Sequence, residues 1–350
     1  MSDLKQRCLS LCKEGSYQEL KNLLENDKGA GEFIDLLVTL SSGYGNIEIL
    51  ELAKQHGGNL DCKNGNAFGN ACRYGRCDIV EYLLKNGVDV TSQNYYGLCW
   101  AVRNKHIKIV KNILASGVSV NIRDNFLLNL SVEINDYNMT KMFLEMGIDA
   151  NGHENFPIVH ASKKGYLSTV ALLVDYDVDV STDKSRALSS MCYFGNLEIV
   201  RKIIAKGAKV TDNSSMAVSQ ACLSEDNDKL QVIEYLVSHG ADLHNREDIC
   251  MVYVCKSGGL DVLLYLIKQG LDIAAHDRKT IKNCVRFGQY QLAEELLENN
   301  IKIDDIYDEL IDMAKKNKDT EIIDLINEFY SSSDNSELDS TDKDGLSDEI

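Results

Sequence analysis

Long apolar runs are missing from this sequence of 350 residues. No stretch approaches the ~20 apolar residues that a helix needs to cross a bilayer. The N-terminal residues MSDLKQRCLSLCKEG also lack the continuous apolar segment of a secretory signal peptide. We therefore expect an intracellular protein, located in the cytoplasm, without a membrane anchor.

The usual patterns of metal, nucleotide and catalytic sites are missing as well. The 11 cysteines include no Cys-x-x-Cys pair, the seven histidines do not cluster, and no glycine-rich loop has the spacing that cradles a phosphate. We expect no metal, no cofactor and no enzymatic activity. A thiol nucleophile assembled between neighbouring segments, for example a cysteine close to His160, stays an alternative.

Basic residues are fewer than acidic ones, which leaves a net charge of −17. From Ser331 the sequence SSSDNSELDSTDKDGLSDEI carries seven acidic residues against one lysine and has little to bury, which predicts a disordered tail over residues 331–350. The tail contributes −6, so the rest of the chain carries −11. Such a tail either adds solubility or competes for a basic groove on the same chain.

Glycines recur at a fixed interval. One series, the turn positions, steps by thirty residues: Gly15, Gly45, Gly75, Lys105, Asn135, Gly165, Gly195, then Asp228 after a three-residue slip, Gly258, Gly288 and Lys318. A second series, the cap positions, follows twelve residues later: Gly57, Gly87, Gly117, Gly147, Asp177, Gly207, Gly240, Gly270 and Asn300. Asn and Asp tolerate the left-handed backbone that glycine favours, so both series predict an internal repeat.

The segments around the turn positions predict two helices in each unit. After a turn position, apolar residues fall at i, i+1, i+4 and i+5, as in Ile79, Val80, Leu83 and Leu84, which places one apolar stripe on a short helix. The residue at the cap position then ends that helix. Before a turn position, small residues such as Ala71 predict a first helix that approaches its neighbours closely. Five cysteines share one slot of this first helix, where we expect reduced core thiols: Cys12, Cys72, Cys192, Cys222 and Cys255.

Neither helix of a unit is long enough to persist alone in water, so stacking of about eleven units must supply the stability. The fifth unit, residues 121–150, is the least regular, because Asn135 to Asn138 replace the usual turn and Met139, Thr140, Met142 and Phe143 form a less specified core. The three-residue slip predicts a longer acidic loop at residues 223–228.

The run Ala-x-x-x-Gly-x-x-Asp-Ile-Val-x-x-Leu-Leu-x-x-Gly-x-Asp-Val at residues 71–90 resembles the ankyrin repeat, and the resemblance extends over residues 5–330. It implies an all-α, ankyrin-type solenoid. The family's Thr-Pro-Leu-His motif survives only as Phe-Pro-Ile-Val at residues 156–159, and the period is shorter than the ~33 residues of the family. The missing residues fall in the hairpin finger, so we expect short or collapsed fingers. The Asn-, Ile-, Lys- and Tyr-rich style is similar to that of ankyrin repeat proteins of mimivirus-like giant DNA viruses of amoebae.

This organisation predicts four segments. Residues 1–30 form an N-terminal capping unit, residues 31–303 the repeat array, residues 304–330 a C-terminal capping unit, and residues 331–350 the acidic tail.

The resemblance also implies where a partner binds. In ankyrin proteins the two residues before the turn position line the concave face, and here those slots hold eight basic, five aromatic and only two acidic residues. Arg, Tyr and Phe are typical of interface cores. Twelve residues of these slots, which we call the stripe, are the candidate partner-binding residues: Tyr44, Arg73, Tyr74, Arg103, Lys163, Lys164, Tyr193, Phe194, Lys256, Arg286, Phe287 and Lys316.

The sequence therefore predicts a non-enzymatic, monomeric scaffold or adaptor that binds a protein partner, specifically an acidic, extended segment, on its concave face. If the protein is viral, the partner is a host protein in the host cytoplasm. Basic and aromatic residues are also common at these slots in many ankyrin proteins, so ordinary repeat composition stays an alternative. Nucleic-acid binding along the stripe is a further alternative, although the net acidity of the chain opposes it.

Overall fold

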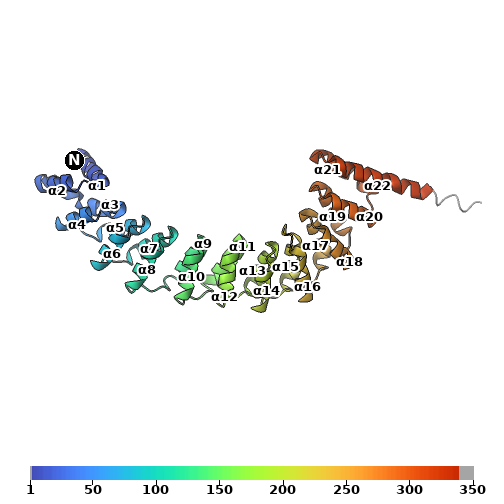
Figure 1. Cartoon of the computed structure of the whole chain (residues 1–350), viewed down its shortest axis with the longest axis horizontal. Coiled ribbons are helices and arrows are strands. Elements are labelled where there is room, and N and C mark those ends of the chain that lie inside the picture. Colours follow the sequence, from blue (N-terminus) through green and yellow to red (C-terminus); the bar gives the residue numbers. More distant parts are fainter. Residues whose placement is uncertain (1, 339–350) are drawn as a thin grey trace, which may run out of the picture. The chain divides into compact units, whose positions relative to one another are not determined.

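The computed structural model describes residues 2–338. Within that part of the chain it contains 22 α-helices, three short 3-10 helices and no β-strand (Figure 1). The chain forms two compact units, one ending at Ala161 and the other beginning at Ser162. The helices follow one another as eleven pairs, which confirms the predicted all-α repeat fold.

In the first compact unit, first and second helices form two layers (Figure 1). The first helices are α1 (Ser2–Glu14), α3 (Ile34–Tyr44), α5 (Cys62–Arg73), α7 (Ser92–Arg103) and α9 (Phe126–Glu133). The second helices are α2 (Tyr17–Asn26), α4 (Ile47–Gln55), α6 (Cys77–Lys85), α8 (Ile107–Ala115) and α10 (Tyr137–Glu145). Successive first helices pack on one another, as α3 on α5 and α5 on α7. The 3-10 helices η1 (Lys28–Phe33) and η2 (His153–Asn155) lie in connectors.

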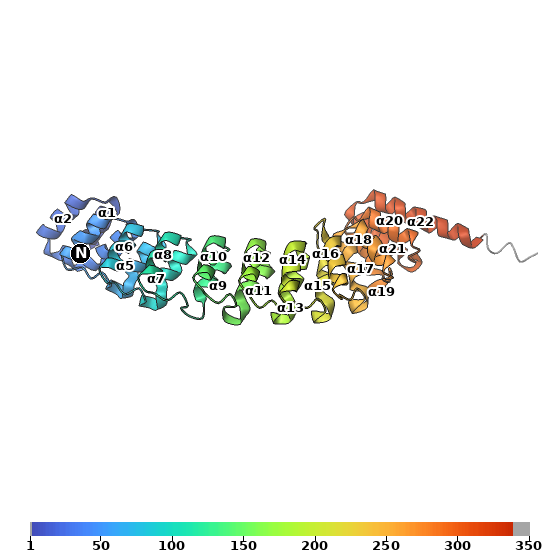
Figure 2. The same ribbon diagram turned by 60° about the horizontal axis from the view of Figure 1, so that its bottom comes forward.

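The second compact unit repeats this two-layer arrangement (Figure 2). Helix α11 (Phe156–Lys164) contains the boundary between the two units and is followed by α12 (Leu167–Asp175). The first helices are then α13 (Thr182–Tyr193), α15 (Asp212–Cys222), α17 (Asn245–Ser257), α19 (Ala275–Arg286) and α21 (Tyr307–Asn317). The second helices are α14 (Leu197–Ala205), α16 (Lys229–Ser238), α18 (Leu260–Lys268), α20 (Tyr290–Glu298) and α22 (Thr320–Leu338), and η3 (Asp304–Ile306) precedes α21.

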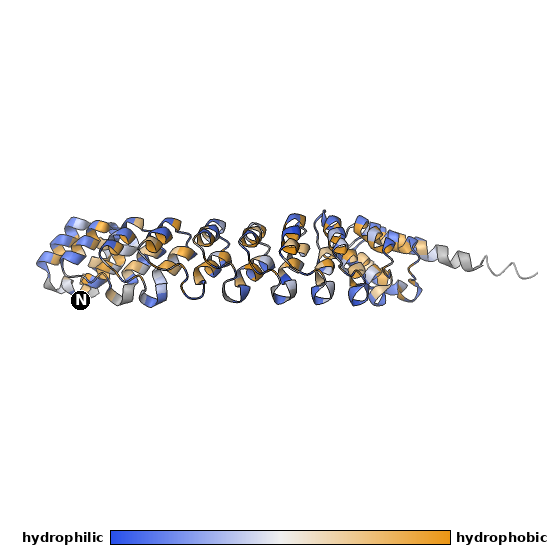
Figure 3. Cartoon of the chain, turned by 90° about the horizontal axis from the view of Figure 1, so that it is seen from below, coloured by the Kyte–Doolittle hydropathy of each residue, from blue (hydrophilic) through white to orange (hydrophobic). Residues whose placement is uncertain are grey.

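The core lies between the layer of first helices and the layer of second helices in each compact unit. The apolar residues of the second helices, such as Ile79, Val80 and Leu83, are buried, and Ala71 on a first helix is fully buried. The five cysteines predicted to share a core slot all have no exposed surface. Figure 3 shows that each helix carries both apolar and polar residues, as expected for helices with one buried and one exposed face.

The turn positions adopt the left-handed backbone that their residue types predict. Gly75 has φ +73°, and the residues that replace glycine do the same: Lys105 has φ +62°, Asn135 +49° and Lys318 +59°. Asp228 is an exception, because its φ is −90°. In that unit the longer loop at residues 223–228 makes the turn, so no left-handed residue is needed at Asp228.

The predicted collapsed fingers are left-handed turns. In the fourth unit Gln93, Asn94 and Tyr95 have φ between +50° and +63°, and Asn213 to Ser215 in the eighth unit repeat this conformation. Asn94 and Asn213 are of the residue type that tolerates such a backbone best after glycine. These left-handed residues lie at the start of α7 and α15, where an ankyrin unit would build its hairpin finger, and the described residues contain no strand there.

Polar side chains near the turn position join each unit to the one before it. Asn46 Nδ2 donates to the carbonyl oxygen of Cys12 at 2.7 Å, and Arg76 Nε donates to that of Gly43 at 3.0 Å. His106 Nε2 lies 3.2 Å from the carbonyl oxygen of Arg73. These carbonyls belong to the last turn of a first helix, where the helix itself supplies no partner. We call these contacts the inter-unit caps.

Substitution of two glycines will separate backbone cost from packing cost. Gly87 and Gly75 have φ of +75° and +73°, but a Cβ at Gly87 would meet nothing within 4 Å, whereas one at Gly75 would lie 2.8 Å from His106 Cε1. We expect Gly87→Ala to cost about 1–2 kcal/mol, from the left-handed backbone alone. Gly75→Ala should cost about 1 kcal/mol more, because it displaces an inter-unit cap. Urea unfolding followed by Trp100 fluorescence measures both; if the difference persists in a His106→Ala background, this explanation is wrong.

The C-terminal helix α22 runs to Leu338, eight residues beyond the boundary predicted between the capping unit and the tail. Residues 339–350 lie outside the described residues, so the disorder predicted for them stays a prediction.

Candidate functional site

The twelve stripe residues lie in the last turn of a first helix or directly after it. Eleven of them are exposed and Phe194 is half-buried. Seven are Lys or Arg, and a cation at a helix C-terminus is favoured by the helix dipole. The dipole accounts for the basic residues of the stripe but not for its aromatic ones.

Large apolar side chains are concentrated at the same slots. Among the described residues, nine large apolar side chains are exposed, and four of the nine belong to the stripe. Tyr44 is 41% exposed, Tyr74 53%, Tyr193 41% and Phe287 44%. Because exposed apolar side chains recur at the two positions before the turn, these rings are candidates for a binding surface.

In the first compact unit the stripe is built around Arg73. Its guanidinium carbon lies 4.4 Å from the centre of the Trp100 ring and 5.5 Å from that of the Tyr74 ring. The Tyr74 ring lies against Gly43 on the preceding first helix, where a Cβ would be 3.5 Å from Tyr74 Cδ2. Cation–π contacts hold Arg73 in place while it stays exposed and able to donate hydrogen bonds.

Sequence reasoning missed two rings of this cluster, Trp100 and Tyr96. The two rings meet edge to face, with centres 6.0 Å apart, and both are half-buried. Trp100 stands one helical turn before Arg103, so the signal was present in the sequence at the i−3 spacing.

The second compact unit brings together the stripe residues of two neighbouring helices. Tyr193 and Phe194 meet edge to face with ring centres 5.3 Å apart. The Phe194 ring lies against the turn at Gly165, where a Cβ would be 2.6 Å from Phe194 Cζ. This contact explains why Phe194 is half-buried, whereas the other stripe residues are exposed. Lys163 and Lys164, both exposed, end the helix before that turn.

Further along the second unit, Lys256, Arg286 and Phe287 form another stripe segment. Lys256 Nζ lies 5.9 Å from the centre of the Phe287 ring. Asn317, beside the exposed Lys316, donates to the carbonyl oxygen of Arg286 at 2.8 Å, which is one more inter-unit cap.

The stripe is interrupted in the eighth unit. Leu223 and Ser224 replace the usual basic and aromatic residues, and the predicted acidic loop follows with Glu225, Asp226 and Asp228 exposed. Asp228 N donates to Asp226 Oδ1 at 2.8 Å, so the loop has a defined local turn.

A buried lysine holds this loop, and sequence reasoning did not find it. Lys229 is only 4% exposed, and its ammonium group donates to the carbonyl oxygens of Ser224 at 2.8 Å and Gly258 at 2.5 Å and to Ser257 Oγ at 3.0 Å. A Cβ at Gly259 would lie 2.7 Å from Lys229 Cε, so only glycine fits there. Burial lowers the pKa of Lys229. We call this arrangement the Lys229 clamp.

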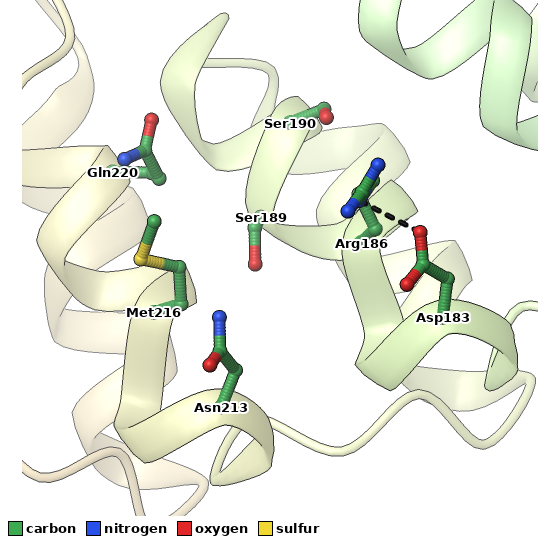
Figure 4. Close-up of a pocket in the computed structure, with 7 residues that line it drawn as sticks. All are labelled: Asp183, Arg186, Ser189, Ser190, Asn213, Met216 and Gln220. Atoms are coloured by element: carbon green, nitrogen blue, oxygen red, sulfur yellow. Dashed lines mark ion pairs between the residues drawn. The ribbon is translucent and has the colours of Figure 1, made fainter.

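An open hollow of about 430 Å³ lies between α13 and α15 (Figure 4). Met216 and Asn213 on α15 face Ser189 on α13, and Arg186 Nε pairs with Asp183 Oδ2 at 2.8 Å at its edge. Ser190 and Gln220 complete the lining. Ser190 stands one helical turn before the stripe residues of α13, so the hollow adjoins the stripe.

Burial limits the reactivity of most of the thiols. Nine of the 11 cysteines are buried, and burial raises the pKa of Cys12 to about 12, which keeps this thiol protonated and unreactive. A hydrogen bond with Cys222 lowers the pKa of Cys250, but Cys250 has no exposed surface. His160, the histidine considered for a thiol nucleophile, stacks on Phe156 with ring centres 5.0 Å apart.

Across residues 2–338, no cluster of three or more His, Cys, Asp or Glu side chains is arranged to bind a metal ion. No helix in that range has the length and apolar character needed to span a membrane.

Two comparisons place the chain among known proteins. The family model for ankyrin repeats in three copies matches residues 9–94, 98–184, 128–214 and 159–247. A similar curated protein is ankyrin repeat protein L112 of Acanthamoeba polyphaga mimivirus, with 27% identity over 96 residues. That alignment spans 27% of this chain and 21% of the mimivirus protein.

Proposed function

Because this chain belongs to the ankyrin repeat family, whose repeats are generally protein–protein interaction modules, we propose that it is a non-enzymatic scaffold that binds a partner protein along the stripe. The observation that carries the proposal is the exposure of the stripe. Four exposed aromatic rings and seven cations, of which Arg73 is held against two rings, lie at the two positions before the turns of a protein whose net charge is −17.

The charge of the stripe indicates the partner. A row of basic residues on an acidic protein attracts an acidic segment and repels basic ones, which sets association rate and register, while the rings supply apolar contact area. We infer that the segment is extended, because within each compact unit the stripe residues follow one another from helix to helix. The similarity to a mimivirus protein is compatible with a viral origin, and on that basis we infer a host protein as the partner. We further propose that the chain binds it as a monomer in the host cytoplasm.

A panned peptide library tests the proposal. Random 16-residue peptides displayed on phage are selected against the full chain, and bound clones are assayed against a variant carrying Arg73→Glu, Tyr74→Ala, Tyr193→Ala and Phe194→Ala. We expect the clones to be acidic and to lose at least about tenfold in affinity on the variant, since these side chains are the proposed anchors.

The matched control carries four changes on exposed residues outside the stripe: Lys111→Glu, Tyr17→Ala, Tyr137→Ala and Tyr176→Ala. It should bind the clones like the wild type. Equal binding to the stripe variant, with folding intact by circular dichroism, would reject the stripe as the site. Steeply salt-dependent binding of a 20-nucleotide single strand would instead favour nucleic acid.

A further inference from the structure

One slot on the first helices holds an aromatic ring in three successive units. Tyr96, Phe126 and Phe156 stand thirty residues apart, and all three are half-buried. The Tyr96 ring lies against the preceding first helix, where a Cβ at Gly69 would be 2.6 Å from Tyr96 Cδ1. In the fourth unit the chain therefore fills the groove between α5 and α7 with its own ring.

The next two units break this series. The corresponding residues are Arg186 and Met216, and both line the hollow between α13 and α15. Ser189 there corresponds to Gly69, and Met216 corresponds to Tyr96, four repeats further along in both cases. The hollow thus lies in the groove that corresponds to the one Tyr96 fills, at a point where the chain supplies no ring.

The lining of the hollow fits a ring that carries a hydrogen-bonding group. Met216 offers a thioether, which makes favourable contacts with aromatic rings. Ser189, Ser190, Asn213 and Gln220 offer hydroxyl and amide groups that both donate and accept hydrogen bonds. A purely apolar side chain would leave those polar groups without partners, whereas a phenol satisfies part of them.

We propose that the hollow binds a tyrosine side chain of the partner segment, so that the partner supplies the ring that the repeat omits. This inference rests on the proposed function, because it takes the partner to lie along the stripe. Tyr193 and Phe194 follow Ser190 by one helical turn, and Lys163 and Lys164 end the preceding first helix. The preferred segment therefore combines a tyrosine with acidic residues next to it.

The first test uses p-cresol, which is the tyrosine side chain as a free molecule. The wild-type protein is labelled with ¹³C at its eight methionine methyl groups, and Met216→Leu identifies the resonance of Met216. We expect p-cresol to shift that resonance saturably, through the ring current, and cyclohexanol to leave it unchanged. Absence of a p-cresol shift at Met216 would overturn the proposal.

The second test closes the hollow from within. Ser189→Gly with Met216→Tyr recreates the Gly69 and Tyr96 pair without changing any charge. For an acidic peptide selected by panning, a Tyr→Ala change in the peptide should cost about tenfold in affinity on the wild type and less than about twofold on this double variant. A melting curve by circular dichroism checks that the variant folds.

The two tests distinguish this inference from the proposed function. Suppose that acidic peptides need the stripe but that their tyrosine contributes equally to the affinity for the wild type and for the double variant. The hollow is then not the tyrosine site, and the scaffold proposal stands. If p-cresol binds at Met216 while no peptide is selected, the hollow binds a phenol, but the scaffold proposal fails and with it the assignment of that phenol to a partner segment.

Discussion

Lys229→Met is expected to lower the free energy of unfolding of the second compact unit by about 3 kcal/mol. Methionine keeps the length of the alkyl chain but removes the donor that serves the carbonyl oxygens of Ser224 and Gly258 and the hydroxyl group of Ser257. Hydrogen bonds from a charged group contribute about 1.5–3 kcal/mol, and a buried acceptor left without a donor costs a further ~1–3 kcal/mol. Some of this cost is recovered, because the buried charge disappears as well.

Hydrogen exchange locates the effect of Lys229→Met. Amides in residues 223–231 and 257–263 should lose protection first, because the Lys229 clamp joins these segments. The control is Lys202→Met, which breaks an exposed ion pair of 3.1 Å with Asp175 and should cost no more than ~0.5 kcal/mol. A loss below about 1 kcal/mol for Lys229→Met would contradict the clamp, since even one charged hydrogen bond contributes more than that.

Phe143→Ala should destabilise the first compact unit by about 3–5 kcal/mol. Phe143 is among the largest side chains with no exposed surface and lies on α10 in the fifth unit, beside the buried Met139 and Thr140. Removal of the ring leaves a cavity. The surrounding helices can close it only in part, because they are packed against neighbouring repeats on both sides. The single tryptophan, Trp100, belongs to the same compact unit, so its fluorescence during urea unfolding reports the loss.

A residue on the same helix gives the control for Phe143. Tyr137→Ala removes a ring that is 41% exposed and should change the stability by less than about 0.5 kcal/mol. Similar effects of the two substitutions would mean that the fifth unit is loosely packed, as its irregular sequence suggests.

The repeat, the helix pairs and the exposed slots could all be predicted, because each depends on residues close together in the sequence. A left-handed turn needs only a residue that tolerates it, as Gly75 and Asn135 do. The apolar stripe of a second helix follows from the helical period, so Ile79 and Leu83 were identifiable as core residues.

The Lys229 clamp and the hollow could not be predicted in the same way. Lysine is rarely buried, and nothing near Lys229 in the sequence signals that Gly258 and Gly259, nearly thirty residues later, shape a site for its ammonium group. The hollow exists because Met216 stands where Tyr96 supplies a ring four repeats earlier. This difference becomes apparent only when the repeats are compared position by position. The cap of α10 in the irregular fifth unit is visible only in the structure, where Asp136 accepts from Met139 N at 2.9 Å.

The inter-unit caps also set an order in which the protein is completed. Each cap joins residues 31 to 34 apart in the chain, which is longer than one repeat, and the donor always belongs to the later unit. During synthesis, the last carbonyl oxygens of a first helix therefore lack these hydrogen-bond donors at first. They gain them about one repeat later, when the next unit has been synthesised. For the same reason an array cut back from its C-terminal end exposes an unfinished helix, whereas one cut back from its N-terminal end does not.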